Sequence, residues 1–212
     1  MAVVSIKRGR FITLEGVDGA GKSTHVPWIA ERLRAGGDAG GREVVVTREP
    51  GGTPLAEKLR ALVLAQAMDP LAETLLMFAA RADHVQTVIA PALARGAWVL
   101  CDRFTDATLA YQGGGKGVPA ERIRQLAQAV HPDLLPDQTL IFDCPYEVSR
   151  SRLSNSGREL DRFEAEERAF FDRVRAAYRR LADAEPARVR LVDGSKASTQ
   201  LKVDIEKMLI SN

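Results

Sequence analysis

Residues 11–24 read FITLEGVDGAGKST, and this stretch decides the fold. Its first four residues, FITL, are apolar or β-branched, as is typical of a buried strand. The strand runs into residues 16–23, GVDGAGKS, which match the phosphate-binding pattern G-x-x-x-x-G-K-[ST] in the strand-then-helix context that this pattern requires. Glycines let the backbone turn tightly, so that successive N–H groups point at one anion. The sequence therefore predicts a nucleotide-phosphate site rather than a Gly-rich turn that arose by chance.

The helix that follows this loop presents its free N–H groups and the positive end of its dipole to the same phosphates. We expect Lys22 to reach the β- and γ-phosphates of a bound nucleotide, and the hydroxyl of Ser23 to ligate Mg²⁺. The residues expected to bind the nucleotide, which would be ATP in a kinase, are Gly16, Val17, Asp18, Gly19, Ala20, Gly21, Lys22, Ser23 and Thr24.

Length and composition favour a single domain spanning residues 1–212, with 45% hydrophobic residues available for a core. The net charge is +2, which gives no strong overall field toward a nucleic acid or a membrane surface. No apolar run approaches membrane-spanning length, and residues 1–10 lack the apolar core of a signal peptide, so we expect a cytoplasmic protein. Cys101 and Cys144 each end an apolar run, which predicts buried free thiols. The three histidines are scattered, without metal-ligand spacing.

Apolar runs recur along the chain with helix-length segments between them. Runs that are apolar on both faces predict strands of a parallel sheet covered on both sides, hence an α/β fold. The runs are Phe11–Leu14, Val44–Val46, Trp98–Cys101, Leu140–Phe142 and Val189–Val192.

The segments between these runs have helical character. Thr53 is placed to cap one helix with Pro54 at its first position, and Pro91 predicts a kink or break in another. One predicted helix, residues 162–184, is amphipathic and carries an inner aromatic stripe. The predicted helices are residues 23–34, 53–67, 71–96, 119–130, 162–184 and 198–209.

Two charged stretches directly follow predicted strands. Asp102 and Arg103 end the run at Trp98, where a carboxylate lies in the ligand crevice of a parallel sheet. Asp102 is placed to hold Mg²⁺ through water, and Arg103 to grip a phosphate. Arg48 follows the second run and opens REPGG, which predicts a second anion site, although a plain strand-to-helix turn would have the same pattern.

Residues 150–168 read RSRLSNSGRELDRFEAEER. Their Ser-Asn-Ser-Gly centre disfavours a helix interior, so the stretch is predicted to be a lid that delivers an arginine to the transferring phosphoryl group. A solvated, charged helix face is the alternative.

Four stretches in order resemble bacterial thymidylate kinases, which belong to the nucleoside monophosphate kinase group of P-loop proteins. They are EGVDGAGKST, TREPGGT, CDRF followed by AYQGGG, and GRELDRFE. The resemblance runs from Phe11 to about Gly194. It implies a five-stranded parallel sheet with helices on both faces, a homodimer, and the reaction ATP + dTMP → ADP + dTDP, which feeds dTTP biosynthesis. A P-loop kinase with another acceptor, or a P-loop switch of GTPase type, would be the alternative; the chain lacks the N-K-x-D guanine motif.

The resemblance also implies roles for single residues. Catalysis would fall to Lys22, Arg103 and a lid arginine, and Gly19 occupies a P-loop position where other family members carry an arginine. Arg158 lies nearest the family's lid arginine, with Arg150, Arg152 and Arg162 as neighbours. The base would stack on Phe78, or on Met77 one position earlier. The residues implied to bind dTMP are Asp18, Arg48, Phe78, Arg81, Arg103, Thr108, Tyr111 and Gln112.

Overall fold

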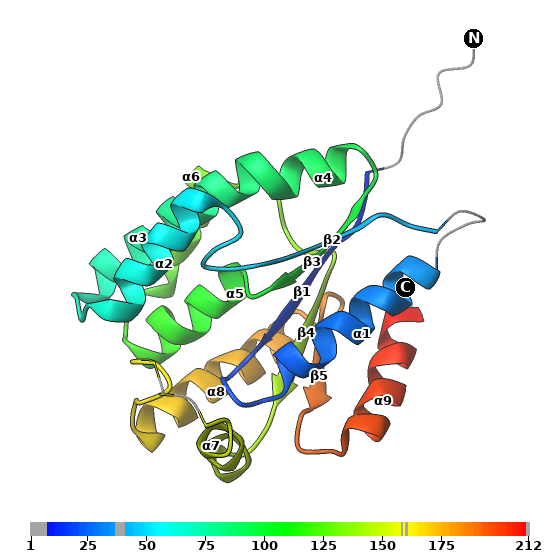
Figure 1. Ribbon diagram of the computed structural model, residues 1–212. Helices are drawn as coiled ribbons and strands as arrows, with labels where there is room; N and C mark the ends of the chain where they lie inside the picture. Colours follow the sequence, from blue (N-terminus) through cyan, green and yellow to red (C-terminus); the bar gives the residue numbers. More distant parts are fainter. Residues whose placement is uncertain (1–7, 37–40, 158, 160, 211–212) are drawn as a thin grey trace.

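The computed structural model describes residues 8–36, 41–157, 159 and 161–210. Its centre is a parallel sheet of five strands in the order β2-β3-β1-β4-β5 (Figure 1). The predicted parallel sheet is confirmed, and each strand contains one of the apolar runs. The strands are β1 Phe11–Gly16, β2 Val44–Arg48, β3 Trp98–Asp102, β4 Gln138–Asp143 and β5 Val189–Asp193.

Strand β1 is the middle strand, and every one of its residues is buried. It pairs with β3 on one side, with Leu14 opposite Asp102, and with β4 on the other, with Gly16 opposite Phe142. All strands run parallel, so their carboxyl ends meet at one edge. The loop after β1 therefore lies at the same edge as the ends of β2 and β3, which carry the charged residues Arg48, Asp102 and Arg103.

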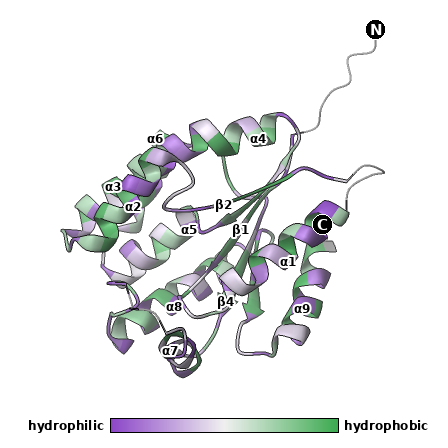
Figure 2. Cartoon of the chain, in the orientation of Figure 1, coloured by the Kyte–Doolittle hydropathy of each residue, from purple (hydrophilic) through white to green (hydrophobic). Residues whose placement is uncertain are grey.

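Helices cover both faces of the sheet, and green, apolar strands lie between them in Figure 2. Helices α1 and α9 lie together on one side, and α3, α4 and α6 lie on the other (Figure 1). The α-helices are α1 Lys22–Ala35, α2 Pro54–Ala65, α3 Pro70–His84, α4 Ala90–Ala94, α5 Thr105–Thr108, α6 Ala120–Val130, α7 Tyr146–Ser154, α8 Arg168–Ala184 and α9 Ser198–Ile210. Two π-helical stretches are η1 Val85–Ile89 and η2 Leu109–Gly115.

Most helix predictions hold within a few residues. Thr53 caps α2 as predicted, because its Oγ1 accepts from the backbone N of Ala56 at 3.0 Å. The stretch from residue 71 to 96 does not break at Pro91. It passes from α3 through the wide turn η1 into α4, and Pro91 lies in the first turn of α4. Proline cannot donate to the carbonyl one turn back, and the π-helical turn before it accommodates the missing bond.

The predicted helix at residues 162–184 starts too early, because α8 begins at Arg168. Asp161 explains the difference. Its Oδ1 accepts from the backbone N of Phe163 at 2.9 Å and of Glu164 at 3.0 Å, while its own N donates to the side chain of Glu164. Such side-chain bonds stabilise a local turn in competition with the helix. We refer to residues 161–164 as the 161–164 turn.

The hydrophobic core consists of the apolar side chains of the strands and of the helix residues packed against them. Cys101 and Cys144 are buried free thiols, as predicted. In the described part of the chain, no helix is long and apolar enough to cross a membrane.

Candidate active site

The loop between β1 and α1 curls around a space at the carboxyl edge of the sheet. Gly21 precedes α1 with φ +101°, a backbone conformation that residues with a Cβ rarely adopt. Gly16 has φ +124°, and a Cβ there would lie 2.2 Å from the carbonyl oxygen of Phe142. Both glycines are therefore required by the backbone path, which leaves the N-terminus of α1 open toward an anion.

Lys22 is buried at the base of this loop. Its Nζ donates to the carbonyl oxygens of Gly16 and Val17, at 3.0 Å each. Burial, and then the nearby charge of Arg103, lower the pKa of Lys22. An ammonium held this way is already desolvated, so a phosphate oxygen that reaches it gains a strong charge-assisted bond.

Asp18 and Arg103 form a close ion pair between the P-loop and the end of β3. Arg103 Nη2 donates to Asp18 Oδ1 at 2.6 Å, and the hydroxyl of Tyr111 donates to Asp18 Oδ2 at 2.9 Å. Burial opposes ionisation of Asp18, but the charges of Arg103 and Lys22 outweigh it and lower the pKa of Asp18 to about 2. The structure thus brings together Asp18, Arg103 and Tyr111, three of the residues that the resemblance implied would bind dTMP.

Arg103 is held from its other side by residues that sequence reasoning missed. Its Nη1 donates to the hydroxyl of Tyr178 at 3.3 Å, and that hydroxyl donates to Glu15 Oε2 at 2.7 Å. The backbone N of Phe104 donates to Glu15 Oε1 at 2.7 Å. Burial, and then the charge of Asp106, raise the pKa of Glu15 to about 8. In the sequence, the one indication of these contacts to Arg103 was a glutamate, Glu15, near the end of a predicted buried strand.

The backbone of Arg103 is also unusual. Among the described residues other than glycine, Arg103 alone has a positive φ, at +73°. A conformation of this kind costs on the order of 1–3 kcal/mol and persists where surrounding contacts enforce it. Its contacts with Asp18, Tyr111 and Tyr178 supply that enforcement and fix the direction of the guanidinium group.

Beside Arg103 lies a pocket with about 640 Å³ of empty space, a volume that includes open solvent. Its walls come from the end of β2, from α2, α3 and η2, and from the 161–164 turn. Six of the residues that the resemblance implied would bind dTMP line it: Asp18, Arg81, Arg103, Thr108, Tyr111 and Gln112.

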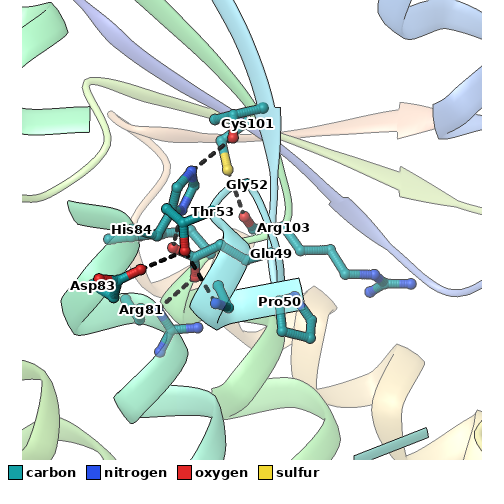
Figure 3. A network of polar contacts seen from close by, with 12 residues as sticks. Glu49, Pro50, Gly52, Thr53, Arg81, Asp83, His84, Cys101 and Arg103 are labelled. Atoms are coloured by element: carbon teal, nitrogen blue, oxygen red, sulfur yellow. Dashed lines mark hydrogen bonds and ion pairs between the residues drawn. The ribbon is translucent and has the colours of Figure 1, made fainter. Parts of the chain in front are cut away.

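Arg81 is fixed within this pocket by a buried polar network (Figure 3). Its Nε donates to Glu49 Oε2 at 2.7 Å and its Nη2 to Thr108 Oγ1 at 3.1 Å. Glu49 is held in turn by His84, whose Nδ1 lies 2.9 Å from Glu49 Oε1 and whose Nε2 lies 2.6 Å from Thr47 Oγ1. Arg81 Nη1 is buried without a partner among the described residues. A donor that is positioned but unbonded is available to a ligand acceptor.

Two predicted ligand residues lie outside the pocket lining. Arg48 points away and pairs with Glu57 at 2.8 Å, because neighbours on an extended backbone face opposite sides and Glu49 takes the inner side. Arg60, on α2, lines the pocket instead, which sequence reasoning missed. Phe78 is buried in a small core cluster with Val118 and Ile123.

Met77 takes the pocket position that Phe78 was expected to hold. It precedes Arg81 by four residues, so the two side chains share one face of α3. Which of Met77 and Phe78 faces the pocket therefore depends on which face of α3 points toward it. The packing of α3 against α6 places Phe78 in the core and leaves Met77 at the pocket.

Arginines of the predicted lid stretch lie around the P-loop and the pocket. Arg152, on α7, donates to the carbonyl oxygens of Gly19 at 3.2 Å and Gly194 at 2.8 Å. Arg150 donates to the carbonyl oxygen of Glu164 at 3.0 Å. Arg158 lies outside the residues that the structure describes.

The residues at the P-loop end fit a Mg²⁺ ion that also takes phosphate oxygens. Asp102 Oδ1 is buried without a hydrogen-bond partner among the described residues, and a hard cation or its water would satisfy it. Ser23, at the start of α1, is exposed and offers its hydroxyl. No cluster of three His, Cys, Asp or Glu side chains suited to a metal occurs within the ranges described.

Comparisons with known proteins agree on one family. The family model described as "Thymidylate kinase" matches residues 14–205. A thymidylate kinase of Bordetella pertussis is 58% identical over 199 residues, which cover 94% of this chain and 93% of the relative. One of Cupriavidus metallidurans is 54% identical over 202 residues, 95% and 98% of the two chains. The crystal structure of thymidylate kinase from Ehrlichia chaffeensis has a TM-score of 0.76 and 35% identity, and the match covers 95% of this chain and 99% of that one.

Proposed function

Since the chain belongs to the thymidylate kinase family and phosphorylates dTMP to dTDP with ATP, a step in dTTP biosynthesis, we propose how its site divides between the two substrates. The P-loop holds the phosphates of ATP, and the pocket beside Arg103 holds dTMP. The observation that supports this division is the ion pair between Asp18 of the P-loop and Arg103 of the pocket, at 2.6 Å. It lies where donor and acceptor phosphates have to meet.

At the acceptor end, Arg103 binds the dTMP phosphate. Arg60 lines the same pocket and supplies the second phosphate contact; Arg48 would do so only after leaving Glu57. Arg81, Thr108 and Gln112 contact the base, with the unpartnered Nη1 of Arg81 donating to a base carbonyl. Met77 packs against the ring. Tyr111 and Asp18 lie at the sugar.

At the donor end, backbone N–H groups of residues 16–24 surround the β- and γ-phosphates, and Lys22 exchanges its two carbonyl partners for phosphate oxygens. Ser23 and Asp102 would hold Mg²⁺, which neutralises charge on the β- and γ-oxygens when bound.

The acceptor atom is an oxygen of the dTMP phosphate, whose second pKa near 6 leaves it dianionic at neutral pH. No side chain therefore has to remove a proton. Catalysis consists of alignment and charge stabilisation by Lys22, Arg103 and a lid arginine, a role that we assign to Arg158. The 161–164 turn helps to exclude water, which would otherwise accept the phosphoryl group.

We extend the proposal to the assembly and the location of the enzyme. The chain forms one kinase domain, with residues 150–168 as its lid, and acts in the cytoplasm as a homodimer. Exposed leucines on α2 and α3 support self-association: Leu55 is 50%, Leu62 38% and Leu75 48% exposed. Light scattering of the wild type and of Leu62→Glu, which should be monomeric, tests this point.

The function is tested by coupled ADP release with ATP as donor across dTMP, dUMP, dCMP, AMP and GMP. We expect the highest kcat/KM with dTMP. A faster reaction with AMP or GMP would place the enzyme among the other nucleoside monophosphate kinases, and hydrolysis of GTP without any acceptor would favour a switch protein.

A further inference from the structure

Glu73 is a fully buried carboxylate on α3, and the proposed mechanism gives it no role. An ionised group in this position is costly unless it is paired and hydrogen-bonded. Glu73 has three partners from distant parts of the chain, and two of them are cations. Gln112 Nε2 donates to its Oε1 at 2.8 Å, Lys116 Nζ donates to its Oε2 at 2.8 Å, and Arg162 donates to the same Oε2. Burial opposes ionisation, but these donors outweigh it and lower the pKa of Glu73, so the group is an anion at neutral pH.

An ionised carboxylate can only accept hydrogen bonds, and this decides the orientation of the Gln112 amide. The atom of Gln112 that faces Glu73 has to be the donor Nε2. The amide carbonyl Oε1 is then the atom left to contact a ligand in the pocket, which Gln112 lines. A carbonyl oxygen accepts an N–H. Thymine carries a hydrogen on N3, whereas N3 of cytosine is an acceptor, so the amide in this orientation favours thymine.

The same carboxylate also fixes one wall of the pocket. Arg162 belongs to the 161–164 turn, and its neighbours Asp161 and Phe163 line the pocket. Besides binding Glu73, Arg162 donates through Nε to the carbonyl oxygen of Val63 on α2. The Phe163 ring lies against both cations, 4.3 Å from the Arg162 guanidinium and 4.6 Å from Lys116 Nζ. The turn is therefore attached to α2 and α3 through one side chain.

We propose that Glu73 is a positioning residue for the acceptor: it orients the Gln112 amide to select a base with a hydrogen on N3, and it holds the 161–164 turn against the pocket through Arg162. This inference rests on the proposed acceptor site. Glu73 touches neither the substrate nor the reacting atoms, so its effect is on dTMP binding and base choice rather than on the transfer step.

Three variants separate the two roles of Glu73. In Glu73→Gln one of the two acceptor oxygens is replaced by an NH₂ group. This donor then has to face another donor, from Gln112, Lys116 or Arg162. We expect KM for dTMP to rise by on the order of tenfold or more, and the ratio of kcat/KM for dTMP over dCMP to fall by a similar factor, with kcat at saturation within a fewfold of wild type. Arg162→Ala should raise KM for dTMP but keep the base ratio, and Arg162→Lys should restore most of the loss. Glu121→Gln, on the exposed face of α6, is the matched control.

Affinity for ATP and the thermal unfolding midpoint are measured for each variant, because a generally damaged fold would change both. A folded Glu73→Gln enzyme with the wild-type KM and base ratio would overturn the proposal. Arg162 is one-fifth exposed, and Arg162→Ala leaves Glu73 bound to Lys116 and Gln112. A KM within twofold of wild type in Arg162→Ala would therefore overturn the proposal even if Glu73→Gln did not fold. A wild-type enzyme that did not prefer dTMP over dCMP would instead refute the proposed acceptor site.

Discussion

Glu15 is fully buried at the carboxyl end of β1, and replacing it with glutamine should change how stability depends on pH. Burial, followed by the charge of Asp106, raises the pKa of Glu15 from 4.5 to about 8 in the folded protein. Between these pH values the folded protein keeps a proton that the unfolded chain releases. The stabilisation is complete below pH 4.5 and is lost as the pH rises through 8.

The magnitude follows from proton linkage. Each pH unit within this window lowers the free energy of unfolding by about 1.4 kcal/mol, so the step from pH 5 to pH 7 should remove roughly 3 kcal/mol. Glutamine has the shape of the neutral acid and does not titrate. Its carbonyl can still accept from the backbone N of Phe104, as Glu15 does at 2.7 Å. Glu15→Gln should therefore be close to wild type in stability at pH 5 and more stable than wild type at pH 8.

The assay is urea unfolding without nucleotide at pH 5, 6, 7 and 8, monitored by the fluorescence of Trp28 and Trp98. The difference between wild type and variant cancels the titration of all other groups that the substitution leaves unchanged. Glu31→Gln, on the exposed side of α1, is the control and should run parallel to wild type. Parallel curves for Glu15→Gln as well would refute the argument, because they would mean that Glu15 is ionised in the folded protein across this range.

Further substitutions test the donor site, the acceptor site, the lid and the fold. Lys22→Ala should lower kcat by on the order of a hundredfold with folding intact, and near-normal turnover would contradict its phosphate role. Arg103→Ala should weaken dTMP binding in calorimetry much more than ATP binding; equal losses would argue against two separate sites. Arg158→Ala should lower kcat sharply while both dissociation constants stay near wild type, whereas a loss of affinity would make Arg158 a binding residue. Thr53→Ala should cost about 1 kcal/mol in urea unfolding, because α2 loses its N-cap, and an unchanged midpoint would contradict that role.

The sequence by itself determined the sheet, the P-loop and several helix ends. Each of these depends on a local pattern: strands buried on both faces have to be apolar throughout, and a phosphate loop needs glycines at fixed spacing. The cap at Thr53 with Pro54 after it is equally local. The resemblance added that Asp18 and Arg103 both bind dTMP, and the two side chains form an ion pair at 2.6 Å.

Only the tertiary structure decided which side chains face the pocket and what holds them. Met77 and Phe78 are adjacent and both apolar, and the packing of α3 against α6 selects between them. Glu15 and Tyr178 are far apart in the chain, and Glu73 is 89 residues from Arg162, so no local pattern announces either contact. Buried charges of this kind are stable only where folding brings donors from several elements to one point, and that convergence is a property of the packed chain rather than of any one segment.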